Sequence, residues 1–221
     1  MKPDFVLLGD SHTIALEDGA KALGLTPAVL RFGGAGWHER KFSWGADGFI
    51  PRGSAMGTRA RARLREEMGV TNIFGTGVPV ITTVGFYLGQ LVGPMGWSDH
   101  HIQRTPDDMP QDGLLMSSAF VEAYVLHYRR PHLRLLRRLA KSTRLIVVPP
   151  PTIADYGNIP QVRALLIRLM RNEGLDVFDP VEKLLSLDAP FPEELSAGDG
   201  NHANAAFGSM VIDALRKAGK L

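Results

Sequence analysis

The stretch VLLGDSHTIALEDG, residues 6–19, begins as an apolar run and turns polar at GDSH, residues 9–12. A short apolar run ended by glycine is typical of a buried strand, and the segment after it favours a helix. We therefore expect a strand over 5–8 and a helix over 13–23. Ser11 then has two interpretations. It can cap the helix by accepting a backbone N–H, or it can be a nucleophile if a base lies within reach.

Strand-like and helix-like segments alternate along the rest of the chain. This alternation predicts an α/β fold, a three-layer α/β/α sandwich with a mostly parallel central sheet, and one domain over residues 1–221. Residues 37–56 and 85–116 have no period and are expected to be loops, the second of them a long insertion near the active site. The expected further strands lie at 28–32, 78–84, 144–148 and 175–178, and the expected further helices lie at 58–68, 117–141, 160–172 and 203–217, with a break or kink at Pro131.

Composition removes several classes of function. The 221 residues include no cysteine, which excludes disulfides, thiolate catalysis and cysteine-based metal sites. A net charge of +2 is too small to suggest a nucleic-acid partner. No apolar run is long enough to span a bilayer and no secretory signal is visible, so a cytoplasmic location is expected. The Asp99-His100-His101 run is a poor metal-ligand pattern because adjacent side chains diverge, so neither a metal nor another cofactor is expected.

A second polar cluster precedes the last predicted helix. It reads DGNH, residues 199–202. In a parallel sheet, ligand-binding residues gather at the carboxyl ends of the strands, which brings residue 202 to the edge that carries Ser11. An Asp three residues before a His can orient the imidazole while the other ring nitrogen faces a serine. Asp199 and His202 are therefore the candidate orienting acid and base, although the same pattern also occurs in polar turns with a capping Asp.

The pairing of Gly9-Asp10-Ser11 with Asp199-x-x-His202 resembles the SGNH (GDSL-type) hydrolases. The resemblance covers nearly the whole chain in the order of its elements, but its sharp motifs lie only at the two ends. It implies an SGNH-hydrolase or flavodoxin-like fold, with Ser11 as nucleophile, His202 as base and Asp199 as the residue that orients the base. His12 stands where the commonest pattern of the family has Leu, and the GDSH variant also belongs to the family. The G-x-S-x-G, G-x-G-x-x-G and Walker patterns are absent after the first strand.

The resemblance also implies an oxyanion hole. In the family it is built from the serine N–H, a glycine after the second strand and an asparagine after the third. The first two donors fall on Ser11 and on the glycine cluster 33–36, in which we assign Gly34. The third is a departure, because this chain reads GFY at 85–87 and has no asparagine there. Losing one such donor costs a related serine enzyme about 10²–10³ in rate. Three outcomes are therefore open, namely a slow enzyme, an inactive protein, or a substitute donor from Tyr87 or another loop.

Other residues of the predicted loops complete the candidate site. Asp10, His12 and Trp37 are taken as substrate-binding residues. Aromatic residues in these loops would suit an acyl chain or a sugar ring, and they are Trp37, Phe42, Trp44, Phe49, Phe86, Tyr87 and Trp97. The basic set Arg129, Arg130, Arg134, Arg137 and Arg138 is interpreted as a solvated helix face over an apolar stripe, with an anionic partner as the alternative.

Together these features favour a serine ester hydrolase of the acyl esterase, deacetylase or thioesterase type. Its expected partner is a small-molecule ester, with an acetylated sugar as one candidate. Acyl transfer to an alcohol at the same site is the nearest alternative. A non-catalytic module that binds a carbohydrate or a protein is the alternative from another class, motivated by the missing asparagine. A phosphate-binding protein using the first helix start is a third hypothesis. The sequence leaves the oligomeric state open.

Overall fold

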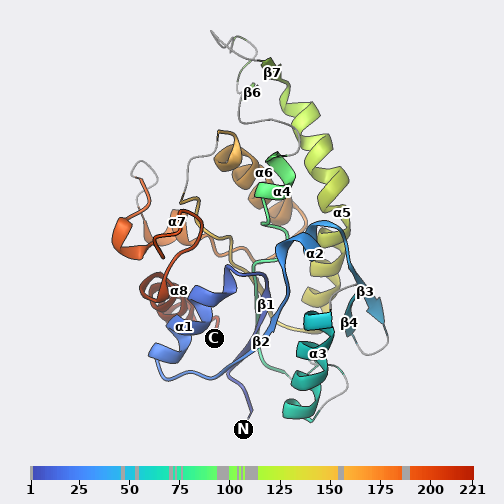
Figure 1. Cartoon of the computed structure of the whole chain (residues 1–221), viewed down its shortest axis with the longest axis vertical. Coiled ribbons are helices and arrows are strands. Elements are labelled where there is room, and N and C mark those ends of the chain that lie inside the picture. The colour runs from blue at the N-terminus through green and yellow to red at the C-terminus, as the bar shows by residue number, and fades with distance from the viewer. Residues whose placement is uncertain are drawn as a thin grey trace.

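A parallel sheet forms the centre of the molecule. In the computed structural model its described strands run in the order β2 (Pro27–Arg31), β1 (Phe5–Gly9), β5 (Val80–Thr82) and β8 (Leu145–Val147), and all neighbours are parallel (Figure 1). The structure describes residues 2–45, 48–52, 55–69, 72, 74–75, 77–93, 100–103, 105, 107, 114–153, 157–185 and 190–221.

Strand β1 explains why the sheet has a core on each side. Successive side chains of a strand point to opposite faces. Phe5 and Leu7 pack into one buried cluster, whereas Val6 and Leu8 pack into the other. All five residues of β1 are buried, as the uninterrupted apolar run predicts for a central parallel strand. The chain is therefore the three-layer α/β/α sandwich expected from the sequence.

Helices cover both faces of the sheet. The cluster with Phe5 and Leu7 takes in apolar residues of α1 (Thr13–Ala22) and α8 (Ala205–Lys217). The cluster with Val6 and Leu8 takes in residues of α3 (Ala55–Met68), α5 (Ser118–Ser142) and α6 (Ile159–Asn172). Shorter pieces join these layers, namely the helices α2 (Gly34–His38), α4 (Gly89–Val92) and α7 (Pro180–Leu184) and the 3-10 helix η3 (Glu193–Leu195).

Two of the predicted loops contain regular structure. The region 37–56 holds the end of α2 and an antiparallel pair, β3 (Phe42–Gly45) and β4 (Gly48–Pro51). The region 85–116 holds α4 and a short parallel pair, β6 (His100–Ile102) and β7 (Leu114–Met116), near the far end of α5 in Figure 1. Conversely, the predicted strand at 175–178 is reduced to a single parallel bridge between Val147 and Val177.

The predicted break or kink at Pro131 is wrong as a break, because α5 runs through this residue. A proline cannot donate to the carbonyl four residues before it, here that of His127. The guanidinium of Arg40 donates to this carbonyl at 3.0 Å instead. Arg40 is the one described non-glycine residue with a positive φ, 60°, and it lies two residues after the end of α2. A side chain from another element thus satisfies the carbonyl that the proline leaves without a donor.

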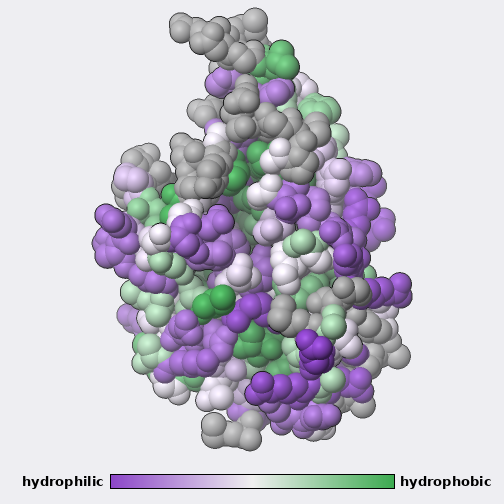
Figure 2. All heavy atoms as spheres, viewed as in Figure 1, coloured by the Kyte–Doolittle hydropathy of each residue, from purple (hydrophilic) through white to green (hydrophobic). Residues whose placement is uncertain are grey.

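The face of the molecule seen in Figure 2 is mostly hydrophilic, with hydrophobic residues in small separate groups. The large apolar side chains that are most exposed include Leu114 on β7 and Phe120 on α5. No helix in the described part of the chain combines the length and the apolar character needed to cross a membrane.

Candidate active site

The candidate site lies where the parallel strands end. Gly9, the last residue of β1, pairs with Arg31, the last residue of β2, and its carbonyl accepts a 3.1 Å hydrogen bond from the N–H of Phe32. The turn after β1 and the loop after β2 therefore leave the sheet side by side. The N–H of Thr83, just after β5, donates to the carbonyl of Leu8 at 3.2 Å. Three loops thus meet at one edge, as the topology predicts.

Ser11 and His202 meet at this edge although 191 residues separate them. The Ser11 hydroxyl lies 2.8 Å from Nε2 of the His202 ring. The N-cap position of α1 is taken by His12, and no side chain caps this helix start. Of the two interpretations of Ser11, the structure therefore agrees with the one in which its hydroxyl faces a base.

Asp199 holds the other side of the His202 ring. Its Oδ2 lies 2.6 Å from Nδ1 of His202. An ionised carboxylate can only accept a hydrogen bond, so Nδ1 donates to Asp199, and in this tautomer Nε2 is the atom that can accept the Ser11 hydroxyl. Oδ1 of Asp199 also accepts the N–H groups of Asn201 and His202, at 2.9 and 2.8 Å. The hydrogen bond from His202, followed by these two backbone donors, holds the pKa of Asp199 well below its usual range.

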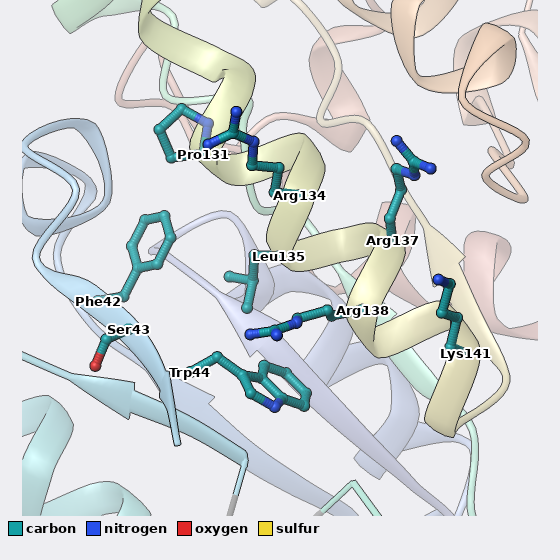
Figure 3. Close-up of a pocket in the computed structure, with 9 residues that line it drawn as sticks. All are labelled: Phe42, Ser43, Trp44, Pro131, Arg134, Leu135, Arg137, Arg138 and Lys141. Carbon is teal, nitrogen blue, oxygen red and sulfur yellow. The ribbon is translucent and has the colours of Figure 1, made fainter. Parts of the chain in front are cut away.

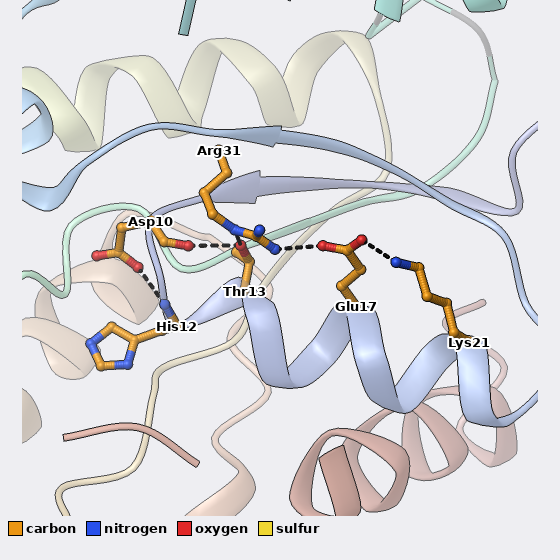
Figure 4. Close-up of polar contacts among 6 residues, drawn as sticks. All are labelled: Asp10, His12, Thr13, Glu17, Lys21 and Arg31. Carbon is orange, nitrogen blue, oxygen red and sulfur yellow. Dashed lines mark hydrogen bonds and ion pairs between the residues drawn. The ribbon is translucent and has the colours of Figure 1, made fainter. Parts of the chain in front are cut away.

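Asp10 fixes the turn that carries Ser11. Its side chain is buried, and Oδ1 accepts the N–H of His12 at 3.1 Å and the hydroxyl of Thr83 at 3.2 Å. Its carbonyl accepts the hydroxyl of Thr13 at 2.7 Å (Figure 4). The carboxylate is thus occupied within the protein. These hydrogen bonds give Asp10 a positioning role in the turn, and its contact with substrate stays a prediction.

The same network continues along α1 and ties it to β2. Arg31 donates through Nε to the Thr13 hydroxyl at 2.8 Å and through a terminal nitrogen to Glu17 at 2.7 Å, and Lys21 donates to the same carboxylate (Figure 4). Partial burial raises the pKa of Glu17, but hydrogen bonds from Lys21 and Arg31 outweigh it and leave the pKa below its ordinary value. The first helix is therefore anchored beside the Ser11 turn.

A cavity of about 360 Å³ opens beside Ser11 and His202. The loop after β5 forms part of its wall through Phe86 and Tyr87. The Pro150-Pro151 segment after β8 forms another part. The remaining lining residues are His12, Leu88, Gly89, Gln90, Thr152, Ile153, Ile159, Arg163 and Asn201.

His12 is the second imidazole of the site. Its ring centroid lies 4.9 Å from that of His202, and it lines the cavity as predicted from its place after Ser11. Burial lowers its pKa, and the nearby His202 adds to this, against the opposing effect of Asp10. His12 is therefore held in its neutral form at pH 7. A substrate role for it stays a prediction.

Gly34 and Tyr87 lie against each other beside the Ser11 turn. A Cβ placed on Gly34 would lie 2.3–2.5 Å from carbon atoms of the Tyr87 ring, so only glycine allows this approach. Tyr87 lines the cavity, whereas Gly34 begins α2, and the first N–H groups of a helix have no partner within it. The structure thus places two of the three residues assigned to the oxyanion hole against each other, and their role as donors stays a prediction.

Arg129 organises the segment 85–87 and was missed as a site residue. Its guanidinium is buried and donates to the carbonyl of Gly85 at 2.7 Å and to that of Tyr87 at 2.9 Å, with His38 Nδ1 at 3.3 Å (1% of the residue is exposed). Burial lowers its pKa to about 10, so it stays charged at pH 7. The sequence interpretation placed Arg129 on a solvated basic face, which is wrong for this residue. An arginine within the apolar stripe of a predicted helix was the available signal.

Arg163 likewise holds a segment of the cavity wall, the Pro150-Pro151 segment after β8. It forms a two-pronged ion pair with Asp179, at 2.6 and 3.0 Å, and its Nε donates to the carbonyl of Pro150 at 2.7 Å. Both side chains of the pair are nearly buried. Asp179 in turn caps α7 by accepting the N–H of Val181. Removing one partner would leave the other charge buried and unpaired. The ion pair holds Arg163 in place, and its bond to the carbonyl of Pro150 fixes the proline segment that lines the cavity.

Trp37 does not lie at the cavity, which corrects its predicted contact with substrate. Its side chain is 2% exposed and packs between the rings of Phe32 and Phe42, with centroids at 3.9 and 5.4 Å. A large apolar ring next to two others gains more from the core than from the rim. Of the other aromatic residues predicted at the rim, Trp97 and the side chain of Phe49 lie outside the described residues.

No group of three His, Cys, Asp or Glu that could hold a metal ion occurs among the residues that the structure describes. His100 and His101 lie on β6, and Asp99 is outside the described part.

Comparison with known proteins places this geometry on a known fold. No family model and no curated protein matches the sequence. The structure aligns over 98% of this chain and 83% of the other with the periplasmic domain of a lipopolysaccharide acetyltransferase from Salmonella ser. Paratyphi A, at 10% identity and a TM-score of 0.50. At this level of identity the alignment shows that the two proteins share a fold.

Two further solved structures align more loosely. One is a protein designated an acylhydrolase from Bacteroides fragilis, with 15% identity, a TM-score of 0.46 and coverage of 100% of this chain and 89% of the other. The other is an acetyl xylan esterase from Butyrivibrio proteoclasticus, with 12% identity, a TM-score of 0.45 and coverage of 98% and 64%.

Proposed function

We propose that this protein is a serine ester hydrolase that works through an acyl-enzyme on Ser11. The observation that carries the proposal is the continuous chain of hydrogen bonds from the Ser11 hydroxyl to Nε2 of His202 at 2.8 Å and from Nδ1 of His202 to Asp199 at 2.6 Å. A serine hydroxyl is a weak nucleophile until an adjacent base takes its proton. This series of hydrogen bonds supports His202 as that base, with the proton on Nδ1 and with Nε2 facing the hydroxyl.

In the first half of the reaction, Ser11 Oγ attacks the ester carbonyl as Nε2 of His202 accepts its proton. The imidazolium that forms is stabilised by the carboxylate of Asp199, whose lowered pKa keeps it ionised. His202 then protonates the departing alcohol oxygen, and the acyl group stays on Ser11. The ring is 29% exposed at its side chain, so water can reach the acyl-enzyme, and the same nitrogen activates that water to release the acid.

The developing oxyanion needs donors that are already in place. The N–H groups of Ser11 and Gly34 and the hydroxyl of Tyr87 are the proposed donors. They come from the loops after β1, β2 and β5, which meet at the same sheet edge. Tyr87 would take the place of the asparagine that the related pattern has, because its segment is clamped by Arg129 and its ring rests on Gly34.

The cavity supports a small ester as substrate. Its apolar lining includes Leu88, Pro151 and Ile153, which suits an acyl group, and Gln90 and Asn201 supply polar contacts for a hydroxylated leaving group such as a sugar. Acyl transfer to an alcohol is the second candidate, because an alcohol can replace water in the second half. The aligned Salmonella domain, which is described as an acetyltransferase domain, favours keeping it.

The first experiment is intact-mass labelling with a fluorophosphonate probe, on the wild type, Ser11→Ala and His202→Gln. We expect one adduct on the wild type, none on Ser11→Ala and slow labelling of His202→Gln. An acyl-ester panel, with and without added alcohols or sugars, then separates hydrolysis from transfer by the products. A folded wild type without an adduct would contradict the proposal and favour the non-catalytic binding module. An adduct that persists in Ser11→Ala would place the activated group elsewhere.

A further inference from the structure

A second and larger cavity lies away from the Ser11 site. It is a groove of about 460 Å³ between strand β3 and helix α5. It shares no lining residue with the cavity beside Ser11. Figure 3 shows Phe42 and Trp44 on the strand side, Leu135 between the two elements and arginines on the helix side. We call it the β3–α5 groove. The esterase proposal does not use it.

The helix side of the groove is strongly basic. Arg134, Arg138 and Lys141 are spaced by four and three residues, which places them on one face of α5. Among the described residues none of these three has a carboxylate partner, whereas Arg137 pairs with Glu173 at 2.9 Å. Like charges four residues apart on a helix repel each other, so Arg134 and Arg138 destabilise α5 unless an anion lies between them.

The strand side of the groove is aromatic. Trp44 is half-buried, its ring stacks on Phe74 with an angle of 19° between the planes, and the guanidinium of Arg138 lies 5.9 Å from a Trp44 ring centroid. Figure 3 shows Arg138 reaching from the helix toward this ring. Aromatic side chains that line a groove can hold the planar ring of a ligand. A guanidinium beside them attracts both that ring and a phosphate group of the ligand.

We propose that the β3–α5 groove binds a nucleotide-like ligand, that is, a planar ring carrying two or more phosphate groups. Arg134, Arg138 and Lys141 have no carboxylate partner among the described residues. Three such cations favour a ligand with more than one negative charge, which a single carboxylate would not supply. The aromatic wall favours a ring over free phosphate. The groove volume falls within the range of about 300–1,000 Å³ that is common for small-ligand sites. An exposed basic face without this wall, such as that of Arg130, would have only counter-ions beside it.

The test is the binding of a fluorescent ADP derivative to the full chain, followed by anisotropy. We expect saturable binding that unlabelled ADP displaces, with adenosine and pyrophosphate each at least about tenfold weaker as competitors. Arg138→Gln and the pair Arg134→Gln and Arg138→Gln should each weaken binding by about tenfold or more, the usual scale for charge-assisted bonds to phosphate. Arg130→Gln, a neighbouring exposed arginine outside the groove, and Ser11→Ala should bind as the wild type does.

Four results would overturn the proposal. The first is no saturable binding by a wild type whose thermal unfolding shows it to be folded. The second is unchanged binding by the folded double variant. The third is equal weakening by Arg130→Gln, which would mean that only net charge matters. The fourth is pyrophosphate competing as well as ADP, which would mean that the ring contributes nothing. None of these results bears on the labelling of Ser11, so the two proposals are tested separately.

Discussion

Gly19 of α1 and Gly208 of α8 meet backbone to backbone. A Cβ on Gly19 would lie 2.2 Å from the carbonyl carbon of Gly208, and one on Gly208 would lie 1.7 Å from the carbonyl oxygen of Ala15. Helix α1 begins just after Ser11 and α8 begins just after His202. This contact between two glycines is therefore part of what sets the Ser11–His202 distance.

Gly208→Ala should accordingly damage both stability and activity. The added methyl group has no room, so α8 must move away from α1, at a cost of about 1–3 kcal/mol in the free energy of unfolding. The shift lengthens the bond between Ser11 and His202, and we expect a lower kcat with little change in KM. Gly93→Ala is the matched control, because a Cβ there meets nothing within 4 Å. Urea unfolding and ester kinetics measure the two effects, and equal values for both variants would contradict this account.

Asp199→Asn should slow the reaction without unfolding the protein. An amide can present its NH₂ to Nδ1 of His202, which favours the tautomer with the proton on Nε2 and removes the acceptor from Ser11. In the Ser-His-Asp template this change costs about 10⁴ in kcat, and we expect a loss of about 10²–10⁴ here. Asp213→Asn, at an exposed carboxylate paired with Lys217, is the control. Activity within about threefold of the wild type would remove Asp199 from the mechanism.

Tyr87→Phe tests the proposed third oxyanion donor. The substitution keeps the ring against Gly34 and removes only the hydroxyl. If that hydroxyl donates to the oxyanion, kcat should fall by about 10²–10³, while KM changes little. Tyr128→Phe, a tyrosine outside the cavity lining, controls for the chemical change. An unchanged kcat in Tyr87→Phe would shift the third donor to another group.

Arg129→Lys should weaken the hold on the segment 85–87. A lysine keeps the charge but cannot span the carbonyls of Gly85 and Tyr87 as the fork of an arginine does. A lost hydrogen bond to a charged group costs about 1.5–3 kcal/mol. We expect kcat to fall by about tenfold or more and labelling by fluorophosphonate to slow. Arg130→Lys, at the exposed next position, should match the wild type in both measurements. A normal kcat in a folded Arg129→Lys would contradict a positioning role.

His132 should make stability depend on pH. Burial, followed by the nearby charge of Arg129, lowers its pKa to about 3, and Nδ1 has no partner among the described residues. Between about pH 3 and 6.5 the unfolded chain therefore binds more protons at this residue than the folded chain does. The contribution of His132 to the free energy of unfolding is present in full above pH 6.5 and is lost as the pH falls through this range. From pH 7 to pH 5 this loss is about 2 kcal/mol.

The matching experiment compares urea unfolding at pH 7 and pH 5. His132→Gln should be less stable at pH 7, since the fit around Trp37 is disturbed, but its stability should fall less toward pH 5 than that of the wild type. His127→Gln, at an exposed histidine of the same helix, should keep the wild-type slope. An equal change in the free energy of unfolding between pH 7 and pH 5 for the wild type and His132→Gln would contradict the low pKa of His132.

The parallel sheet and the meeting of Ser11 with His202 were predictable because they depend on few assumptions. An apolar run ended by glycine marks a buried strand, and parallel strands place their carboxyl ends at one edge. The pair β3 and β4 was missed because each strand has only four residues and includes glycine or proline, which favour a loop in the sequence. Helix α5 runs through Pro131, and the donor to the free His127 carbonyl is Arg40, a residue 91 positions before the proline, which no local pattern reveals.

The walls of the site were harder to predict than its centre. Arg129 and Arg163 hold the wall segments through backbone carbonyl oxygens, and a carbonyl has no side-chain signature in the sequence. Trp37 was misplaced because a tryptophan beside a glycine cluster suits both a rim and a core. Asp10 was assigned to substrate binding because the sequence does not distinguish a buried carboxylate, which accepts an N–H and a hydroxyl, from a carboxylate that faces solvent.

The long separation of Ser11 and His202 along the sequence has a consequence for biosynthesis. The ribosome makes Ser11 first and reaches His202 191 residues later. While the last helix is still inside the exit tunnel, the strand and helix that carry Ser11 have emerged without their base. The nascent protein therefore carries Ser11 without its base until the segment with His202 has emerged, and under the proposed function the serine becomes reactive only once α8 has docked against α1.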